Sequence, residues 1–252
     1  MFLDNKSKYS ELLNEYRRKY RSNCKRCKGT GLIDKNGISV VCECEKKIFH
    51  IVSLIKNGIP ERIINYVNWE DLISKYKNDA IKMQKYTKDI DNIGNLMIFG
   101  ESNKEIKEIL TALSLDLKNR KIIMISVNNL IQLYNDFNTK ASVMKVLVEN
   151  KDNSILILNN FGNEPDSKTE YTSKVLSEIL QNRVDNGKIN IVSTLLDKKI
   201  VMKKYDNALI SIFKDSFIPI TMKYKVQGMT NELFSNDKIA NIENSKDGEY
   251  FE

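Results

Sequence analysis

The sequence lacks any apolar run long enough to cross a membrane, and its first residues, MFLDNKSKYSELL, turn polar within four positions. A membrane-spanning helix needs about 20 mainly apolar residues, and a secretory signal needs an apolar segment after a basic start. We therefore expect no membrane span, no secretory signal, no membrane partner and a cytoplasmic location. The 252 residues, 41% of them hydrophobic, suffice for one mid-sized core with a small satellite.

Cysteine is absent outside a short segment, where four cysteines form two close pairs, Cys24-Lys-Arg-Cys27 and Cys42-Glu-Cys44. Two such pairs can converge as four thiolates around one tetrahedral metal, and soft thiolate ligands select zinc. A reducing cytoplasm disfavours disulfides between them. Because all four ligands are protein thiolates, no coordination position is left open, and we expect a structural zinc. The single histidine, His50, is expected to pack or face solvent rather than bind the metal.

Positive charge exceeds negative charge by seven, with one local concentration between residues 17 and 26. Such a surplus makes a polyanionic partner plausible but is also common on solvated faces. The candidate DNA-binding residues lie beside two tyrosines, Tyr16 and Tyr20; these basic residues are Arg17, Arg18, Lys19 and Arg21. They could contact phosphates while the tyrosines stack on bases, or the tyrosines could pack inward and the charges remain solvated.

From residue 93 onward, short apolar segments alternate with amphipathic ones, which is typical of βαβ units around a parallel sheet. The predicted strands are Asn95–Phe99, Ile122–Val127, Ile155–Leu158, Ile189–Thr194 and Phe217–Thr221. The predicted helices between them cover 103–118, 128–150, 168–186 and 204–214. The fold class is therefore α/β, a P-loop-type parallel sheet flanked by helices and preceded by a small zinc-binding helical domain.

The pattern divides the chain into four parts. We expect a zinc-binding domain over 1–60, a linker or helical connection over 61–92, the α/β domain over 93–228 and a flexible acidic tail over 229–252. The boundary near residue 60 rests on Asn57-Gly58, a helix-terminating signal, followed by Pro60. The tail holds six acidic residues and few large apolar ones, which favours disorder.

Gly100 follows the first strand of the α/β part, where the phosphate-binding loop Gly-x4-Gly-Lys-Ser/Thr would begin. Glu105, Ile106 and Lys107 then stand at the second glycine, the phosphate-binding lysine and the magnesium-binding hydroxyl. Ser102 and Glu105 instead predict a capping box that opens the next helix. The carboxylate of Glu105 would occupy the anion-attracting helix end, where a triphosphate needs amide donors.

A second nucleotide element is altered in the same way. The strand ending in Asn159-Asn160 has the position of the segment whose two acids hold magnesium and activate water. An uncharged amide holds magnesium poorly and cannot accept a proton from water as a carboxylate does. We expect this edge of the sheet to have lost its nucleotide chemistry.

Taken in order, these motifs resemble the DnaC/DnaI-type replicative helicase loaders of bacteria and their phages, which are AAA+ proteins. The matching segments are Cys24–Gly31, Cys42–Cys44, Gly58–Pro60, Phe99–Gly100, Ser126–Leu130, Leu156–Glu164, Glu178–Gly187 and Ile191–Thr194. The resemblance implies a zinc head that binds a DnaB/DnaC-type hexameric helicase and a body that binds ATP and single-stranded DNA. It also places Leu195 where the family has its sensor asparagine and Ile212 where it has its arginine finger.

Coordinated loss at these positions predicts a pseudo-ATPase without catalysis. The leading hypothesis is an ATP-independent helicase loader or loader-like adaptor that binds the helicase through its zinc head. One alternative is a decoy or regulator that inhibits a helicase or an active loader paralogue; another is a single-stranded DNA-binding module. A residual ATPase with rearranged ligands would use Lys104 or Lys107 on phosphate and Glu164 or Asp166 on magnesium.

Overall fold

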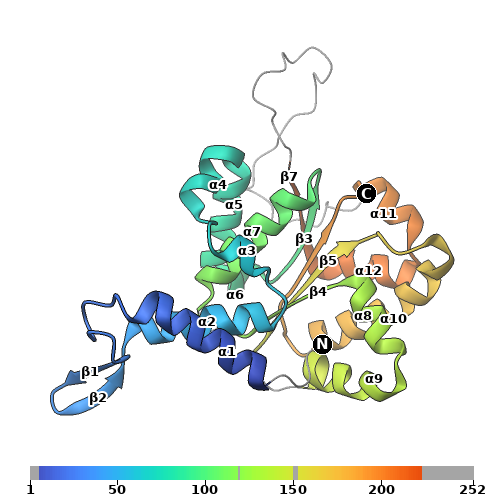
Figure 1. Cartoon of the computed structure of the whole chain (residues 1–252). Coiled ribbons are helices and arrows are strands. Elements are labelled where there is room, and N and C mark those ends of the chain that lie inside the picture. The colour runs from blue at the N-terminus through green and yellow to red at the C-terminus, as the bar shows by residue number, and fades with distance from the viewer. Residues whose placement is uncertain (1–5, 119, 150–152, 223–252) are drawn as a thin grey trace.

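The computed structural model describes residues 6–118, 120–149 and 153–222, and the expected acidic tail 229–252 lies outside them. The described chain forms three layers, with one parallel sheet between two layers of helices (Figure 1). A smaller hairpin projects from one side. None of the helices in the described ranges has the length and apolar character needed to span a membrane.

The central sheet has five strands in the order β4-β5-β6-β3-β7, and all its neighbouring strands run parallel. These strands are β3 (Asn95–Gly100), β4 (Ile122–Ser126), β5 (Ile155–Phe161), β6 (Asn190–Thr194) and β7 (Phe217–Met222). The α/β prediction is confirmed, and each predicted strand differs from the observed one by a few residues at most. Near-continuous apolar runs mark these strands because both faces of the sheet are buried.

One face of the sheet is covered by the helices that follow β4, β5 and β6. These elements are α8 (Val127–Asn135), α9 (Phe137–Met144), η2 (Lys145–Glu149), η3 (Asp166–Lys168), α10 (Thr169–Asp185), α11 (Lys198–Lys204) and α12 (Asn207–Ser216). Met97 and Phe99 of β3 point into this layer, whereas Leu96 and Ile98 point into the other one. The alternation follows from the two-residue period of a strand.

The opposite face is covered by α7 and by helices from the first part of the chain. They are α2 (Glu43–Lys56), α3 (Glu61–Ile64), α4 (Trp69–Tyr76), α5 (Asn78–Lys88), α6 (Ile90–Ile93) and α7 (Asn103–Asp116). Tyr16 and Ile48 from the cysteine-containing part belong to the same apolar cluster as Leu96 and Ile98 of the sheet. The first part therefore shares a core with the α/β part.

The cysteine-containing part is not purely helical. It contains α1 (Lys6–Tyr16), the π-helical turn η1 (Arg17–Arg21), and two strands that pair antiparallel, β1 (Leu32–Lys35) and β2 (Ile38–Val41). The ribbon β1–β2 was missed in the sequence, although Asn36 and Gly37 between two short apolar segments are a strong hairpin signal. Both residues have positive φ, 57° and 80°, as a tight two-residue turn requires.

The end of α2 docks on the edge strand β4. The Met124 amide donates to the Asn57 carbonyl at 2.8 Å. Gly58 has φ of 99°, and a Cβ atom on it would lie 2.0 Å from the Met124 carbonyl oxygen. Only glycine fits at position 58, where a backbone conformation rare for other residues meets a close backbone contact.

His50 of α2 contacts the Ser114 carbonyl through Nε2 at 3.1 Å, so it packs against α7, and burial lowers its pKa.

Arg183 of α10 is fully buried beneath the amino-terminal edge of the sheet. Its guanidinium donates to the Asn190 side chain and to the carbonyls of Leu147, Ser154 and Ile189. Burial lowers its pKa to about 10. The planar group thus joins η2 to the starts of β5 and β6 and pairs with the carbonyls of Leu147 and Ser154, whereas the Ile189 carbonyl also accepts from the Leu156 amide.

Candidate functional site

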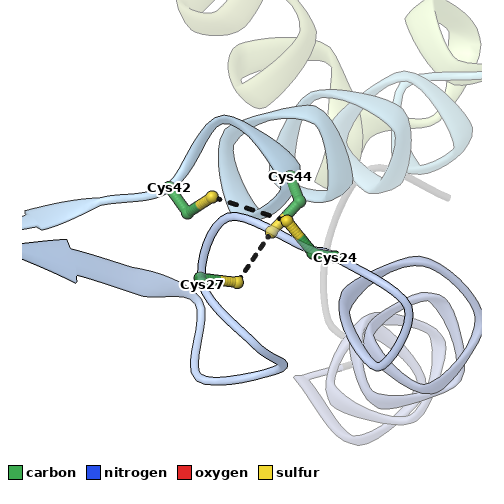
Figure 2. Close-up of side chains that lie close together, drawn as sticks. All are labelled: Cys24, Cys27, Cys42 and Cys44. Atoms are coloured by element: carbon green, nitrogen blue, oxygen red, sulfur yellow. Dashed lines mark hydrogen bonds between the residues drawn. The ribbon is translucent and has the colours of Figure 1, made fainter.

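The four cysteine side chains converge at the base of the ribbon (Figure 2). Their sulfur atoms all lie within 4.8 Å of one another. The Cys24–Cys42 sulfur distance is 3.8 Å and the Cys27–Cys44 distance is 3.5 Å. A tetrahedral zinc with sulfur bonds of about 2.3 Å requires sulfur separations of about 3.8 Å. The described thiols therefore fit one zinc ion, with no need for His50 as a ligand.

Local backbone structure places the sulfurs. Cys24 and Cys27 lie in the turn after η1, while Cys42 caps α2 and Cys44 lies in its first turn. Amide hydrogen bonds lower the pKa of Cys24. Burial raises the pKa of Cys27, but amide and thiol hydrogen bonds outweigh it and bring the pKa to about 6. Burial and neighbouring thiols raise the pKa of Cys44. Amide donors directed at sulfur are the expected surroundings of a thiolate-bound metal.

A buried carboxylate braces this turn. Glu45 of α2 is 5% exposed and pairs with Arg17 Nη2 at 2.6 Å and with Arg21 Nη1 at 3.7 Å. Arg21 also donates to the carbonyls of Gly29 and Thr30, and its side chain packs over Gly31. Sequence reasoning missed this brace, because the arginines read equally well as free basic groups.

The candidate DNA-binding residues therefore differ in their surroundings. Arg17 and Arg21 are engaged with Glu45, whereas Arg18 and Lys19 are exposed. Tyr16 is 1% exposed and donates to Glu61 at 3.0 Å, so its ring is unavailable for stacking on a base. Lys19 lies over the Tyr20 ring, which is partly buried against the core. The aromatic groups contribute to packing rather than to an open stacking platform.

The connection from β3 to α7 is short and leads directly into the helix. Only Glu101 and Ser102 separate the strand from the helix, and the Ile106 amide already donates to the Ser102 carbonyl at 3.1 Å. Ile106 is buried at 3% exposure, and a Cβ atom on Gly100 would lie 2.7 Å from its Cδ1. Lys107 is half-buried in the helix. A phosphate loop needs several free amides in non-helical backbone, and here they are in a helix.

Glu105 lies in the first turn of α7 at 1% exposure. Ser102 caps α7, but its side chain makes no capping hydrogen bond, so the predicted capping box does not form. Neither carboxylate oxygen of Glu105 has a hydrogen-bond partner among the described residues. Burial, together with the negative charges of Asp79, Glu101 and Glu108, raises its pKa to about 7. The Glu105 side chain therefore lies near acidic residues of α5, of α7 and of the turn before α7.

Asn159 and Asn160 lie near the end of β5, at a bulge in the ladder with β6. Asn160 has a positive φ of 57°, and Asn159 lies opposite Ser126 of β4 with a buried Oδ1 atom that has no partner in the described ranges. Leu195 is 37% exposed just after β6. Gly100, Asn159, Asn160 and Leu195 thus lie at the carboxyl edge of the sheet, where parallel α/β folds bind ligands.

Ile212 occupies a different environment. It lies in α12 at 7% exposure and belongs to the apolar cluster with Leu209 and Phe213. An arginine finger must reach a neighbouring active site. The Ile212 side chain instead packs within its own chain, in this core.

Glu164, one of the two acids that a rearranged magnesium site would use, makes several contacts of its own. Glu164 is 5% exposed and accepts from the Gly162 amide at 3.2 Å and from the Tyr205 hydroxyl. The ammonium of Lys204 lies 3.7 Å from the same carboxylate. The side chain of Asp166 lies outside the described part. Through these contacts Glu164 holds the loop after β5 against α11.

A five-stranded parallel sheet in this order, with a helix after each inner strand, defines an AAA+-type α/β fold. No protein-family model matches the chain, and a search of curated proteins finds no match. Among solved structures, a crystal structure of DnaI aligns with a TM-score of 0.53 at 16% identity, covering 67% of this chain and 93% of that one.

Two further structures give the same result. The DnaC helicase loader aligns with a TM-score of 0.51 at 13% identity, covering 65% of this chain and 100% of that one. The replication initiator DnaA bound to AMPPCP and single-stranded DNA aligns with a TM-score of 0.51 at 12% identity, covering 67% of this chain and 52% of that one. The chain thus has a DnaC/DnaI-like fold, as the sequence motifs predicted.

Proposed function

We propose that this protein is an ATP-independent helicase loader or loader-like adaptor in DNA replication. The observation that carries the proposal is the β3–α7 connection, where the buried Ile106 packs against Gly100. A DnaC/DnaI-like body in which this connection is closed supports a protein-binding role without nucleotide turnover. The partner is a DnaB/DnaC-type helicase hexamer, bound through the zinc-containing part.

The chemistry of the nucleotide edge supports the absence of catalysis. A triphosphate and its magnesium need free amides, an ammonium and paired carboxylates. This edge offers Ile106, Glu105 and the neutral amides of Asn159 and Asn160. Binding ATP near Glu105 and Glu101 would place its negatively charged phosphates beside carboxylates. Burial already disfavours negative charge in this region.

Zinc has a structural role in this proposal. Cys24, Cys27, Cys42 and Cys44 would hold it, and it would supply a rigid cross-link between the turn after η1 and α2. The residues around it orient the thiolates and fix the base of the ribbon. We further propose that the zinc-containing part (1–60), the connecting helices (61–92) and the α/β body act as one unit, since they share a core.

Two measurements on the full-length protein test the proposal. Calorimetric titration with ATP and magnesium should give no saturable heat, and tight binding would overturn ATP independence. A loading assay with the purified helicase on single-stranded DNA should show stimulation in the absence of ATP. Inhibition would instead identify the decoy alternative.

Single-stranded DNA binding is a separate property. With Arg18 and Lys19 exposed, weak binding of a labelled oligonucleotide that falls steeply with salt is expected from charge alone. Tight binding that persists at high salt would favour the DNA-binding module.

A further inference from the structure

The ribbon β1–β2 projects away from the three-layer body (Figure 1). Five of its eight strand residues are aliphatic, and none of the five belongs to either apolar cluster of the described residues. Ile38 is 67% exposed, Leu32 50% and Val41 43%. An isolated two-stranded ribbon is marginally stable in water, and exposed aliphatic strands favour association.

The aliphatic residues lie on both faces of the ribbon. Leu32 pairs with Val41, and Ile33 pairs with Val40 one position along. Directly opposed residues share a face and successive residues alternate. Leu32 and Val41 therefore lie on one face, while Ile33, Val40 and Ile38 lie on the other. A flat partner surface would cover only one of these faces, whereas a cleft with two apolar walls would cover both.

The base of the ribbon is anchored and positively charged. The Cys42 amide donates to the Gly31 carbonyl at 2.8 Å, so both strands leave directly from the cysteine cluster. Three exposed cations, Lys25, Arg26 and Lys28, lie in the turn that carries Cys24 and Cys27, and the exposed Glu43 between Cys42 and Cys44 pairs with Lys46 at 2.8 Å. An apolar projection with a basic base is complementary to an apolar cleft with an acidic rim.

From this geometry we propose that the ribbon inserts into a two-walled apolar cleft with an acidic rim on the replicative helicase. This role of the ribbon rests on the proposed function. It specifies the ribbon as the element that binds the helicase, and it specifies the shape and charge of the helicase surface that receives it. The zinc site then acts as the rigid support that presents the ribbon at a fixed angle to the body.

The test measures binding of the full-length protein to the purified replicative helicase of the same cell by biolayer interferometry. Leu32→Thr alters one face of the ribbon and Ile38→Thr the other, and threonine keeps strand propensity. Each should weaken binding by about tenfold or more, as expected for loss of a buried aliphatic side chain. Lys28→Glu should slow association and reduce its salt dependence.

Ile218→Thr is the matched control, because Ile218 is 44% exposed on β7, away from the ribbon. Its binding should equal that of the wild type, and zinc content and circular dichroism should be unchanged in all variants. Wild-type binding that neither ribbon variant weakens would overturn the inference and leave the proposed function intact. Weakening by one variant alone would refute the two-walled cleft.

Two other outcomes also decide against the inference. Absence of wild-type binding would overturn the proposed function together with it. Self-association of the wild type that the threonine variants abolish, with unchanged helicase binding, would assign the ribbon to a second copy of this chain.

Discussion

Replacing Glu105 with glutamine should change how stability depends on pH. Glu105 is buried without a partner among the described residues, whereas the nearby Glu108 accepts from the hydroxyls of Tyr66 and Tyr76 at 3.1 and 2.8 Å. Burial, with the charges of Asp79, Glu101 and Glu108, raises the pKa of Glu105 from 4.5 to about 7. This increase in pKa corresponds to about 3 kcal/mol of unfolding free energy, which is present only while Glu105 is protonated.

The sign follows from proton binding. Between the two pKa values the folded state holds the proton on Glu105 more tightly than the unfolded state does. The contribution is therefore complete below the unfolded value and is lost as the pH rises through the folded one. Wild-type unfolding free energy should fall between about pH 4.5 and about pH 7 through this group, while Glu105→Gln should lack this component.

Urea denaturation at constant ionic strength measures the effect as the difference between wild type and variant at each pH. The variant should gain relative stability as the pH rises, by at most about 3 kcal/mol, while the cost of burying its amide lowers its stability equally at every pH. Glu170→Gln is the control, because Glu170 is exposed and its ion pair with Lys174 lies at the surface, where solvent screens it. Parallel pH profiles for wild type and Glu105→Gln would refute the reasoning.

Three further predictions concern the metal, the docking of α2 and the buried arginine. Elemental analysis should find one zinc per chain, and Cys27→Ser or chelation should lower zinc content and thermal stability together; full stability without metal would contradict the structural role. Gly58→Ala should destabilise the protein by more than about 2 kcal/mol in urea, since its Cβ would meet the Met124 carbonyl, whereas Gly37→Ala, with nothing within 4 Å, suffers only backbone strain. Arg183→Met should cost about 3 kcal/mol or more by leaving buried carbonyls unpaired, and a neutral effect by the same measurement would show that they find other partners.

The α/β sheet and the grouping of the cysteines follow from the amino-acid pattern alone. Buried parallel strands are short apolar runs, and a residue such as Gly100 at a strand end marks the edge where ligands bind. The spacing of Cys24, Cys27, Cys42 and Cys44 restricts them to one cluster, because two short loops can bring the pairs together. Both the strands and the cysteine cluster can be predicted because they depend on residues close in sequence or on the regular pattern of apolar positions.

How the parts of the chain fit together depends on contacts between distant segments and could not be predicted from local patterns. The pairing of Arg17 and Arg21 with Glu45 depends on how η1 meets α2, and the same arginines on an open surface would carry the same local sequence. Likewise, the capping box expected at Ser102 and Glu105 does not form, because packing of α5 against α7 buries the carboxylate. Contacts such as Gly58 against Met124 join distant segments, so their energies depend on the assembled fold rather than on local propensity.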